Sequence, residues 1–289
     1  MTGGSTVPHR QLGRRLRELR NQARLTVRAA ASTLEWSEAK LWRIETGRTS
    51  LRGLDVEAMC RVYGAPQRLA EGLMALAKET RAGGWWHSYG DALLEGFDLY
   101  RGLEDAASRL CWYAAELVPG LLQTEAYARA VIRPAGGSEE EVERRVHARL
   151  ASQALLTRAT APPTVRVALG EAVLHRPVGG REVMAGQLGR LMELTDHPDV
   201  SIRVIPFAAG PHPGLQCGPF VLMRFPVTGD GRETEPPTVC AEGLTGALYL
   251  DKPPEIADYD AAFTTIWTTA AGEARSRGLL HEARREFAR

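Results

Sequence analysis

The sequence predicts a chain of two domains: an all-α domain of five helices over residues 1–82 and an α+β domain over residues 83–289. The length of 289 residues suits two domains better than one. Apolar residues recur at helical spacing through the first part of the chain. After residue 83, strand and helix patterns occur without regular alternation, which favours an α+β fold over a doubly wound parallel sheet.

The composition is that of an ordinary globular protein, with 44% hydrophobic and 25% charged residues. No apolar run approaches the length of a membrane-spanning helix, and the basic N-terminal stretch lacks the apolar region of a secretory signal. We therefore expect a cytoplasmic protein. The cysteines form no Cys-x-x-Cys pair, which favours reduced thiols; they are Cys60, Cys111, Cys217 and Cys240. A disulfide between Cys217 and Cys240 is the alternative, since the two could face each other on neighbouring strands.

The overall charge of +1 hides an asymmetry along the chain. Residues 1–80 carry 14 Lys and Arg against 8 Asp and Glu, whereas the remainder carries 22 against 27. A basic small domain joined to an acidic larger one indicates nucleic-acid contact by the first part only. Solvation of helical faces would give the same charges, so local motifs have to decide between the two interpretations.

Three of the five expected helices follow from apolar spacing and from helix-terminating residues. The first helix has an apolar face made by Leu12, Leu16 and Leu19. A fourth helix, over residues 54–63, ends at Gly64, and a fifth begins with Pro66 in its first turn.

The second and third helices are joined by a very short link. Thr26 can cap the second helix and Ser37 the third. The third helix runs to about Thr46, and Gly47 can provide its left-handed end. Only Glu35 and Trp36 separate the two helices, and two short helices with a tight turn between them make a helix-turn-helix unit.

The pattern LRxLRxxAxLT…A…L…WSxxKxxRIETGR resembles the XRE (lambda-repressor-like) family of helix-turn-helix transcription regulators. The resemblance implies that Leu41 and Ile44 face the core. It also implies a structural pair between Arg20 and Glu45 that bridges the first and third helices.

The same resemblance assigns the DNA-contacting side chains. The positions that point at base edges are Glu38, Ala39 and Arg43. The positions that hold phosphates are Ser37, Lys40, Arg48 and Thr49. The chemistry fits, because an arginine can contact guanine through two hydrogen bonds and a helix N-terminus attracts phosphate. The alternatives are an intrahelical ion pair for Arg43 and a solvated surface lysine for Lys40.

Three residues depart from the family pattern. Val27 stands where the second helix usually begins with a polar residue that touches phosphate, and we expect Arg28 to replace that contact. Glu35 occupies a turn position that is often glycine because it needs a positive φ. Trp42 stands where a polar residue is usual and is expected to be exposed on the third helix.

In the larger domain, strands are expected over residues 164–169, 200–207, 220–225 and 238–242. Helices are expected over residues 179–195, 254–271 and 272–287, with a further charged helix that begins at residue 139. The runs WWHSYGD, LVPGLLQTEAYARAV, RPVGGREVM, VIPFAAG, GPFVLMRFP and EGLTGALYLD resemble the C-terminal domain of a large group of actinomycete regulators. These are described as antitoxin-like proteins with a small partner protein. The stretch Ala114-Ala115-Glu116 departs from that group, which puts one partner or ligand contact in doubt.

No nucleotide-binding, nucleophile-elbow or zincin motif occurs, so we expect no enzyme and no cofactor. His212 and Cys217 lie in one loop, but an ordinary loop explains them better than a metal site. Four aromatic residues are candidates to line a ligand pocket: Trp85, Trp86, Tyr89 and Tyr113. The alternative is that they form part of a hydrophobic core. The loop over residues 207–218 could cover such a pocket as a lid.

The leading hypothesis is a sequence-specific transcription regulator that binds a palindromic operator on double-stranded DNA as a homodimer. Its C-terminal domain would dimerise or sense a partner protein or small ligand. The first alternative is an antitoxin-like module that binds a small neighbouring protein. The second is a small-molecule-binding or catalytic domain with a vestigial DNA-binding domain. The operator, the effector and the sign of regulation lie beyond what these motifs specify.

Overall fold

The computed structural model describes residues 7–49, 51–79, 99–229, 231–243 and 246–289. These residues divide into two compact units, the first within residues 1–103 and 242–252, the second within residues 104–241 and 253–289. The boundary predicted at residues 82–83 lies outside the described residues. We call α1–α5 the helical domain and the six-stranded sheet with its covering helices the sheet domain.

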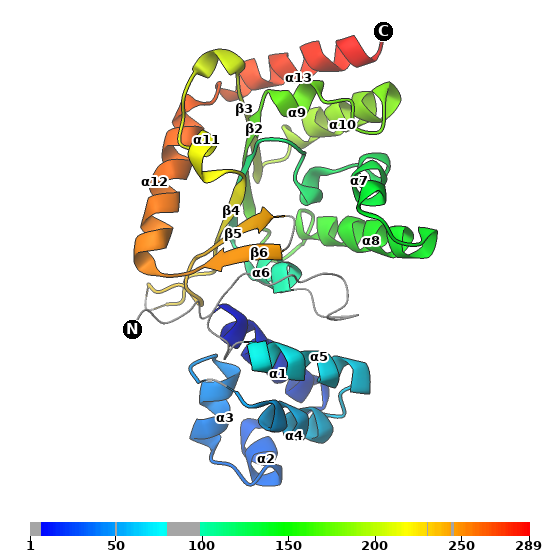
Figure 1. Ribbon diagram of the computed structural model, residues 1–289. Coiled ribbons are helices and arrows are strands. Elements are labelled where there is room, and N and C mark those ends of the chain that lie inside the picture. The colour runs from blue at the N-terminus through cyan, green and yellow to red at the C-terminus, as the bar shows by residue number, and fades with distance from the viewer. Residues whose placement is uncertain (1–6, 50, 80–98, 230, 244–245) are drawn as a thin grey trace. The chain divides into compact units, whose positions relative to one another are not determined.

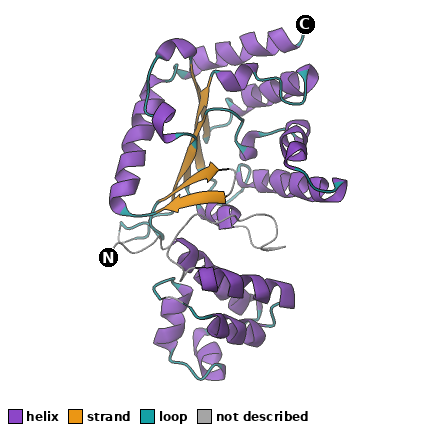
Figure 2. Cartoon of the chain, viewed as in Figure 1, coloured by secondary structure: helices purple, strands orange, loops and turns teal. Residues whose placement is uncertain are grey.

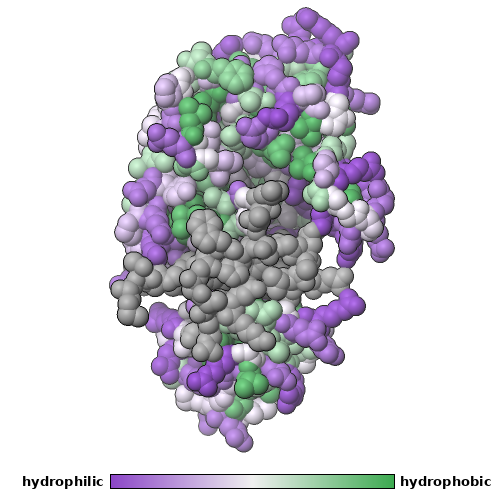
Figure 3. All heavy atoms as spheres, in the orientation of Figure 1, coloured by the Kyte–Doolittle hydropathy of each residue, from purple (hydrophilic) through white to green (hydrophobic). Residues whose placement is uncertain are grey.

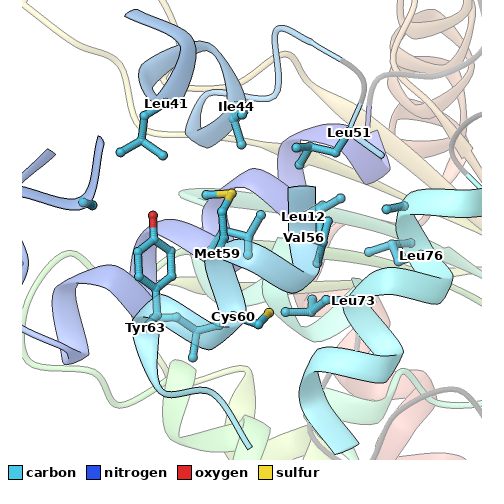
Figure 4. Packing of buried hydrophobic residues seen from close by; sticks show 14 of the residues in the cluster. Leu12, Leu41, Ile44, Leu51, Val56, Met59, Cys60, Tyr63, Leu73 and Leu76 are labelled. Atoms are coloured by element: carbon cyan, nitrogen blue, oxygen red, sulfur yellow. The ribbon is translucent and has the colours of Figure 1, made fainter. Parts of the chain in front are cut away.

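The helical domain contains the five helices that the sequence predicts (Figure 1). They are α1 (Val7–Gln22), α2 (Val27–Thr33), α3 (Glu38–Glu45), α4 (Gly53–Tyr63) and α5 (Gln67–Glu79). Their apolar faces meet in one core, part of which Figure 4 shows. Leu41 and Ile44 of α3 are fully buried in it, as expected. The core therefore fixes which side of α3 faces outward.

The ends of α2 and α3 follow local sequence signals. Thr26 caps α2 by accepting a hydrogen bond from the Ala29 amide, and Ser37 caps α3 by accepting one from the Lys40 amide. The predicted left-handed end of α3 at Gly47 is confirmed, with φ of +67°. Side-chain caps of this kind satisfy backbone donors that a helix leaves free at its first turn.

The turn between α2 and α3 has the geometry of a Schellman motif. The Trp36 amide donates to the Ala31 carbonyl at 2.9 Å, and the Glu35 amide donates to the Ser32 carbonyl at 3.1 Å. This geometry requires a left-handed residue, and Glu35 has φ of +55°. The positive φ predicted for this position is therefore present, held by a residue that is strained there.

Helix α1 approaches the end of α3 unusually closely. A Cβ at Gly13 would lie 2.3 Å from the Ile44 carbonyl oxygen, and one at Gly47 would lie 2.5 Å from the Arg10 Cα. Beside this contact, Arg20 donates to both carboxylate oxygens of Glu45, at 2.6 and 2.9 Å. The predicted pair between α1 and α3 is confirmed.

The sheet domain is built on a mixed sheet with strand order β3-β2-β1-β4-β5-β6. The strands are β1 (Arg109–Ala114), β2 (Thr164–Gly170), β3 (Val200–Ile205), β4 (Phe220–Arg224), β5 (Thr238–Gly243) and β6 (Gly246–Leu250). Strands β1, β2 and β3 are parallel, whereas β4 runs antiparallel to β1 and β5. With helices on both sides, this is the predicted α+β class.

Long helices cover the sheet unequally. Helix α12 (Pro253–Thr269) lies on one side, and α7 (Glu125–Ile132), α8 (Glu139–Ser152) and α10 (Arg181–Leu194) lie on the other (Figure 2). Helix α13 (Glu273–Phe287) packs against α10 and β3. The shorter helices are α6 (Leu99–Ala106), α9 (Ala172–His175) and α11 (Gly214–Cys217), with 3-10 turns at Gly120–Leu122, Arg133–Ala135, Gln153–Leu155 and Phe207–Ala209.

The predicted strands match β2 to β5, but the sequence analysis did not identify β1 or β6. Strand β1 is buried at five successive positions, so its sequence RLCWYA lacks the alternation that marks a half-exposed strand. Strand β6 has only five residues.

The connection after β1 is held by buried polar side chains. Gln187 of α10 donates to the Leu122 carbonyl at 2.8 Å and accepts from the Thr124 amide at 2.7 Å. The Tyr127 hydroxyl accepts a hydrogen bond from the Val118 amide at 3.2 Å. Buried backbone groups need such partners. The run LVPGLLQTEAYARAV therefore forms a rigid segment that docks on α10.

Other features of the surface and the thiols agree with the sequence. No helix among the described residues is long and apolar enough to cross a bilayer. On the face drawn in Figure 3, coloured hydrophobic residues form small groups between hydrophilic ones. All four cysteines are free thiols, so the alternative of a disulfide between Cys217 and Cys240 is wrong.

The close approach of α1 to α3 predicts a glycine requirement. We expect Gly13→Ala to lower the free energy of unfolding of the helical domain by about 1–3 kcal/mol, because the new methyl group overlaps the Ile44 carbonyl. Gly186→Ala in α10 is the matched control, since nothing lies within 4 Å of its added Cβ. It should stabilise the chain by about 0.5–1 kcal/mol. Calorimetric unfolding measures both, and an unchanged Gly13→Ala variant would contradict the close approach.

The polar anchor of the loop after β1 predicts a second stability effect. Gln187→Leu leaves the buried Leu122 carbonyl and Thr124 amide without partners, which should cost about 2–5 kcal/mol. Gln216→Leu changes an exposed glutamine in α11 and should cost less than about 0.5 kcal/mol. Urea unfolding gives the free energies, and amide exchange at Thr124 should accelerate only in the first variant. Equal stability of the two variants would rule out this anchoring role.

Candidate nucleic-acid interface

One side of α3 is exposed along its whole length. The side chains on it are Glu38, Ala39, Trp42 and Arg43. The opposite side, with Leu41, Ile44 and Glu45, is buried against the core. The three predicted base-reading residues therefore lie on one surface. We call this surface, which also includes Trp42, the α3 face.

Arg43 is available for an external partner. Its Nε donates to the Ala39 carbonyl at 3.3 Å, and it makes no ion pair with a described residue. The alternative of an intrahelical ion pair is therefore not what the structure contains. Its planar guanidinium keeps its terminal donors free, which is the arrangement needed for two parallel hydrogen bonds to a base edge.

The predicted phosphate-contacting residues differ in their exposure and in the contacts that they already make within the protein. Arg28 and Ser37 are exposed, and Thr49 is half-buried. Lys40 lies 3.4 Å from Asp55 and 3.5 Å above the centre of the Trp36 ring. Arg48 lies over the Trp42 ring at 4.6 Å. Arg28 makes no ion pair with a described residue, whereas the charge of Lys40 is partly neutralised by Asp55.

Trp42 is the site residue that the sequence analysis did not assign. It was expected to be exposed, and 47% of its surface is. Glu38 and Trp42 are four residues apart, so they lie on one side of the helix. From this spacing alone, the sequence could have predicted that Trp42 lies beside the base-reading residues.

The electrostatics beneath the α3 face are set by Arg20 and Glu45. Both residues are more than nine-tenths buried. The hydrogen bonds to Glu45 raise the pKa of Arg20, against the opposing effect of burial. Burial also raises the pKa of Tyr63, whose hydroxyl has no hydrogen-bond partner among the described residues. Arg20 therefore stays charged, and its two hydrogen bonds to Glu45 fix α3 on α1.

The departures at Val27 and Glu35 have structural roles. Val27 is half-buried and packs against the helical core. Glu35 provides the left-handed turn residue. Neither change disrupts the α2–turn–α3 unit.

The predicted aromatic pocket is only partly within the described residues. Trp85, Trp86 and Tyr89 lie outside them. Tyr113 in β1 is buried, with its ring edge-on to His212 at 5.6 Å and against Gly214. Among the described residues, Tyr113 packs against His212 and Gly214. The role of residues 207–218 as a lid stays a prediction.

Two further predicted features lie near Tyr113. His212 Nδ1 accepts a hydrogen bond from the Gly214 amide at 3.2 Å, and Cys217 is half-buried. No group of three potential metal ligands occurs in the described part of the chain. In the stretch Ala114-Ala115-Glu116, the Glu116 carboxylate pairs with Arg176.

Comparisons with known proteins divide the chain in the same way. Residues 11–73 match the family model described as a helix-turn-helix domain. Residues 97–282 match the model described as a domain of unknown function, DUF5753. A search of curated proteins and a search of solved structures each found no match.

The first match confirms the helix-turn-helix unit and supports a DNA-binding regulator. The XRE subfamily, the actinomycete grouping and the antitoxin likeness stay predictions. The second match spans more than half of the chain, and the protein therefore belongs to the family defined by the domain of unknown function DUF5753.

Proposed function

We propose that the protein is a sequence-specific transcription regulator of the XRE type that places α3 in the major groove of DNA. The observation that carries the proposal is the α3 face, on which Arg43 is exposed and without an ionic partner among the described residues. A helix with polar groups along one exposed side fits the major groove, where the donors and acceptors of each base pair differ.

Each residue of the α3 face has a distinct task in this proposal. Arg43 donates two hydrogen bonds to a guanine, and Glu38 accepts one from a cytosine amino group. The small side chain of Ala39 allows the helix to approach the bases closely. Trp42 supplies an apolar contact to a thymine methyl group.

Phosphate contacts set the register of the helix on the duplex. Ser37 and the first amides of α3 present a positive helix end to one phosphate, with the Ser37 hydroxyl as a further donor. Arg28 and Arg48 contribute charge, and Thr49 contributes a hydroxyl. Lys40 contributes less because Asp55 partly neutralises it.

The proposal extends to the assembly. A homodimer would present two copies of α3 about 34 Å apart, which corresponds to one turn of DNA and a palindromic operator. The DUF5753 domain would dimerise or receive the signal of a partner protein or ligand. Exposed apolar residues follow the carboxyl ends of its parallel strands and support a contact surface there: Leu117, Phe207 and Leu215. The proposal assigns no catalytic step to the chain.

Selection of binding sites from a random DNA library tests the assignment. The wild-type chain should enrich a short palindrome, and Arg43→Ala should lose preference at one base pair per half-site, at a cost of about 1–3 kcal/mol. Arg28→Gln should lower affinity for all sequences alike and reduce the salt slope by about 0.9.

Arg61→Ala is the control, because Arg61 is exposed on α4 and pairs with Glu57. It should leave both the preference and the affinity unchanged. If Arg43→Ala retained the wild-type base preference, α3 would not be the reading helix.

A further inference from the structure

Part of one sheet face in the sheet domain carries exposed side chains. On the side that faces α12, the strand register sets Arg109, Thr164 and Arg166 on neighbouring strands. All three are exposed, and Ser201 and Arg203 of β3 on the same side are half-exposed. Parallel strands are normally covered on both faces. Here the uncovered part of the face is polar and cationic.

Four arginines form a row across this face, one on each of four adjacent strands. From β3 to β4 they are Arg203, Arg166, Arg109 and Arg224, which we call the arginine row. Arg109 lies directly opposite Arg224. Arg166 lies opposite Cys111, two residues along from Arg109, and Arg203 lies opposite Ala168, two residues along from Arg166. The row is therefore diagonal, with neighbours within reach of one ligand.

The charges in the row are unevenly balanced. Arg224 takes two carboxylates, Glu233 at 3.2 Å and Asp260 at 3.1 Å. Arg109 and Arg166 make no ion pair with any described residue. The Arg166 guanidinium lies over the Trp267 ring, with its Cζ 5.8 Å from the ring centre. Two exposed cations therefore lie side by side without a counter-ion in the described part of the chain.

The neighbours of the row supply no missing anion. Arg203 donates to the Trp267 carbonyl at 3.3 Å, and its buried Nε has no hydrogen-bond partner within the described segments. Cys111 lies between the arginines, but burial raises the pKa of its thiol to about 11, so the sulfur stays neutral. Glu273 accepts a hydrogen bond from Ser201 at 3.1 Å and pairs with no arginine that the structure describes.

This arrangement costs stability unless something binds to it. Glu233 and Asp260 already compensate Arg224, so the unbalanced like charges are those of Arg109 and Arg166, diagonal neighbours on β1 and β2 that repel each other. Both side chains are exposed, so neither guanidinium is part of the buried core. A bound anion would remove the repulsion and complete the hydrogen bonds.

We propose that the arginine row binds a phosphate-bearing anion, held by Arg109 and Arg166 with Arg203 at its edge. Phosphate fits better than a carboxylate because its oxygens point in several directions and accept from guanidinium groups on different strands. A phosphate monoester carries about −1.5 to −2 charges, enough to balance two unpaired arginines, whereas a DNA phosphodiester carries one charge, so two backbone phosphates would be needed. A free phosphorylated compound and the DNA backbone both present this chemistry.

Titration calorimetry of the full chain with sodium tripolyphosphate tests the site. The double variant Arg109→Gln with Arg166→Gln should bind tripolyphosphate at least tenfold more weakly than the wild type. The control double variant, Arg190→Gln with Arg275→Gln, removes two charges that pair with Glu193 and Glu282 elsewhere in the sheet domain. The control should bind within twofold of the wild type. Equal binding by the two double variants overturns the proposal.

Folding is checked by thermal unfolding without anion, where the Arg109/Arg166 variant should unfold at the same or a higher temperature because a repulsion is removed. The Arg109→Lys and Arg166→Lys pair keeps the charges and should restore part of the affinity. If the lysine pair binds no better than the glutamine pair and both unfold at lower temperature, the arginines are structural and the proposal fails.

The salt dependence of DNA binding separates the two sources of phosphate. If the row contacts the DNA backbone, the slope of log K against log salt should fall by about 1.8 in the glutamine pair, at about 0.9 per phosphate. If the ligand is a free phosphorylated compound, tripolyphosphate binding should be lost with the slope unchanged. Because α3 is intact in every variant, base preference stays a separate measure of the proposed regulator function.

Discussion

The contact between α1 and α3 is the constraint on which the proposed DNA-reading surface depends. Gly13 and Gly47 allow the two helices to meet at backbone distance. Arg20 and Glu45 then lock the crossing with two hydrogen bonds in a buried site. Removing one partner of such a pair leaves an uncompensated charge, which typically costs about 3–5 kcal/mol. The pair therefore specifies how α3 is oriented, and the exposed side of α3 follows from it.

The sheet domain combines a rigid anchored segment with an open surface. Gln187 satisfies the backbone of the loop after β1, so the connection to α7 and α8 has little freedom. On the other side of the sheet, α12 leaves Arg109 and Arg166 uncovered. The proposed anion site therefore lies on the opposite side of the sheet from the anchored segment.

Local signals allowed most of the helical domain to be predicted, because caps at Thr26 and Ser37 and the left-handed end at Gly47 act within a few residues. The pair of Arg20 and Glu45 came from family resemblance, since 25 residues separate them. Three residues of the α3 face were predicted from the family resemblance, and the four-residue spacing from Glu38 could have added Trp42. The arginine row could not be predicted, because it depends on the register of four strands, and β1 itself was hidden in an apolar run.

The most direct measurement is hydroxyl-radical footprinting of the full chain, with and without the DNA that site selection enriches. Trp42 is 47% exposed on the α3 face, and Val227 is 64% exposed in the sheet domain. The account predicts that DNA lowers the oxidation of Trp42 several-fold and leaves that of Val227 unchanged. Undiminished oxidation of Trp42 in the bound complex would contradict the placement of α3 in the major groove.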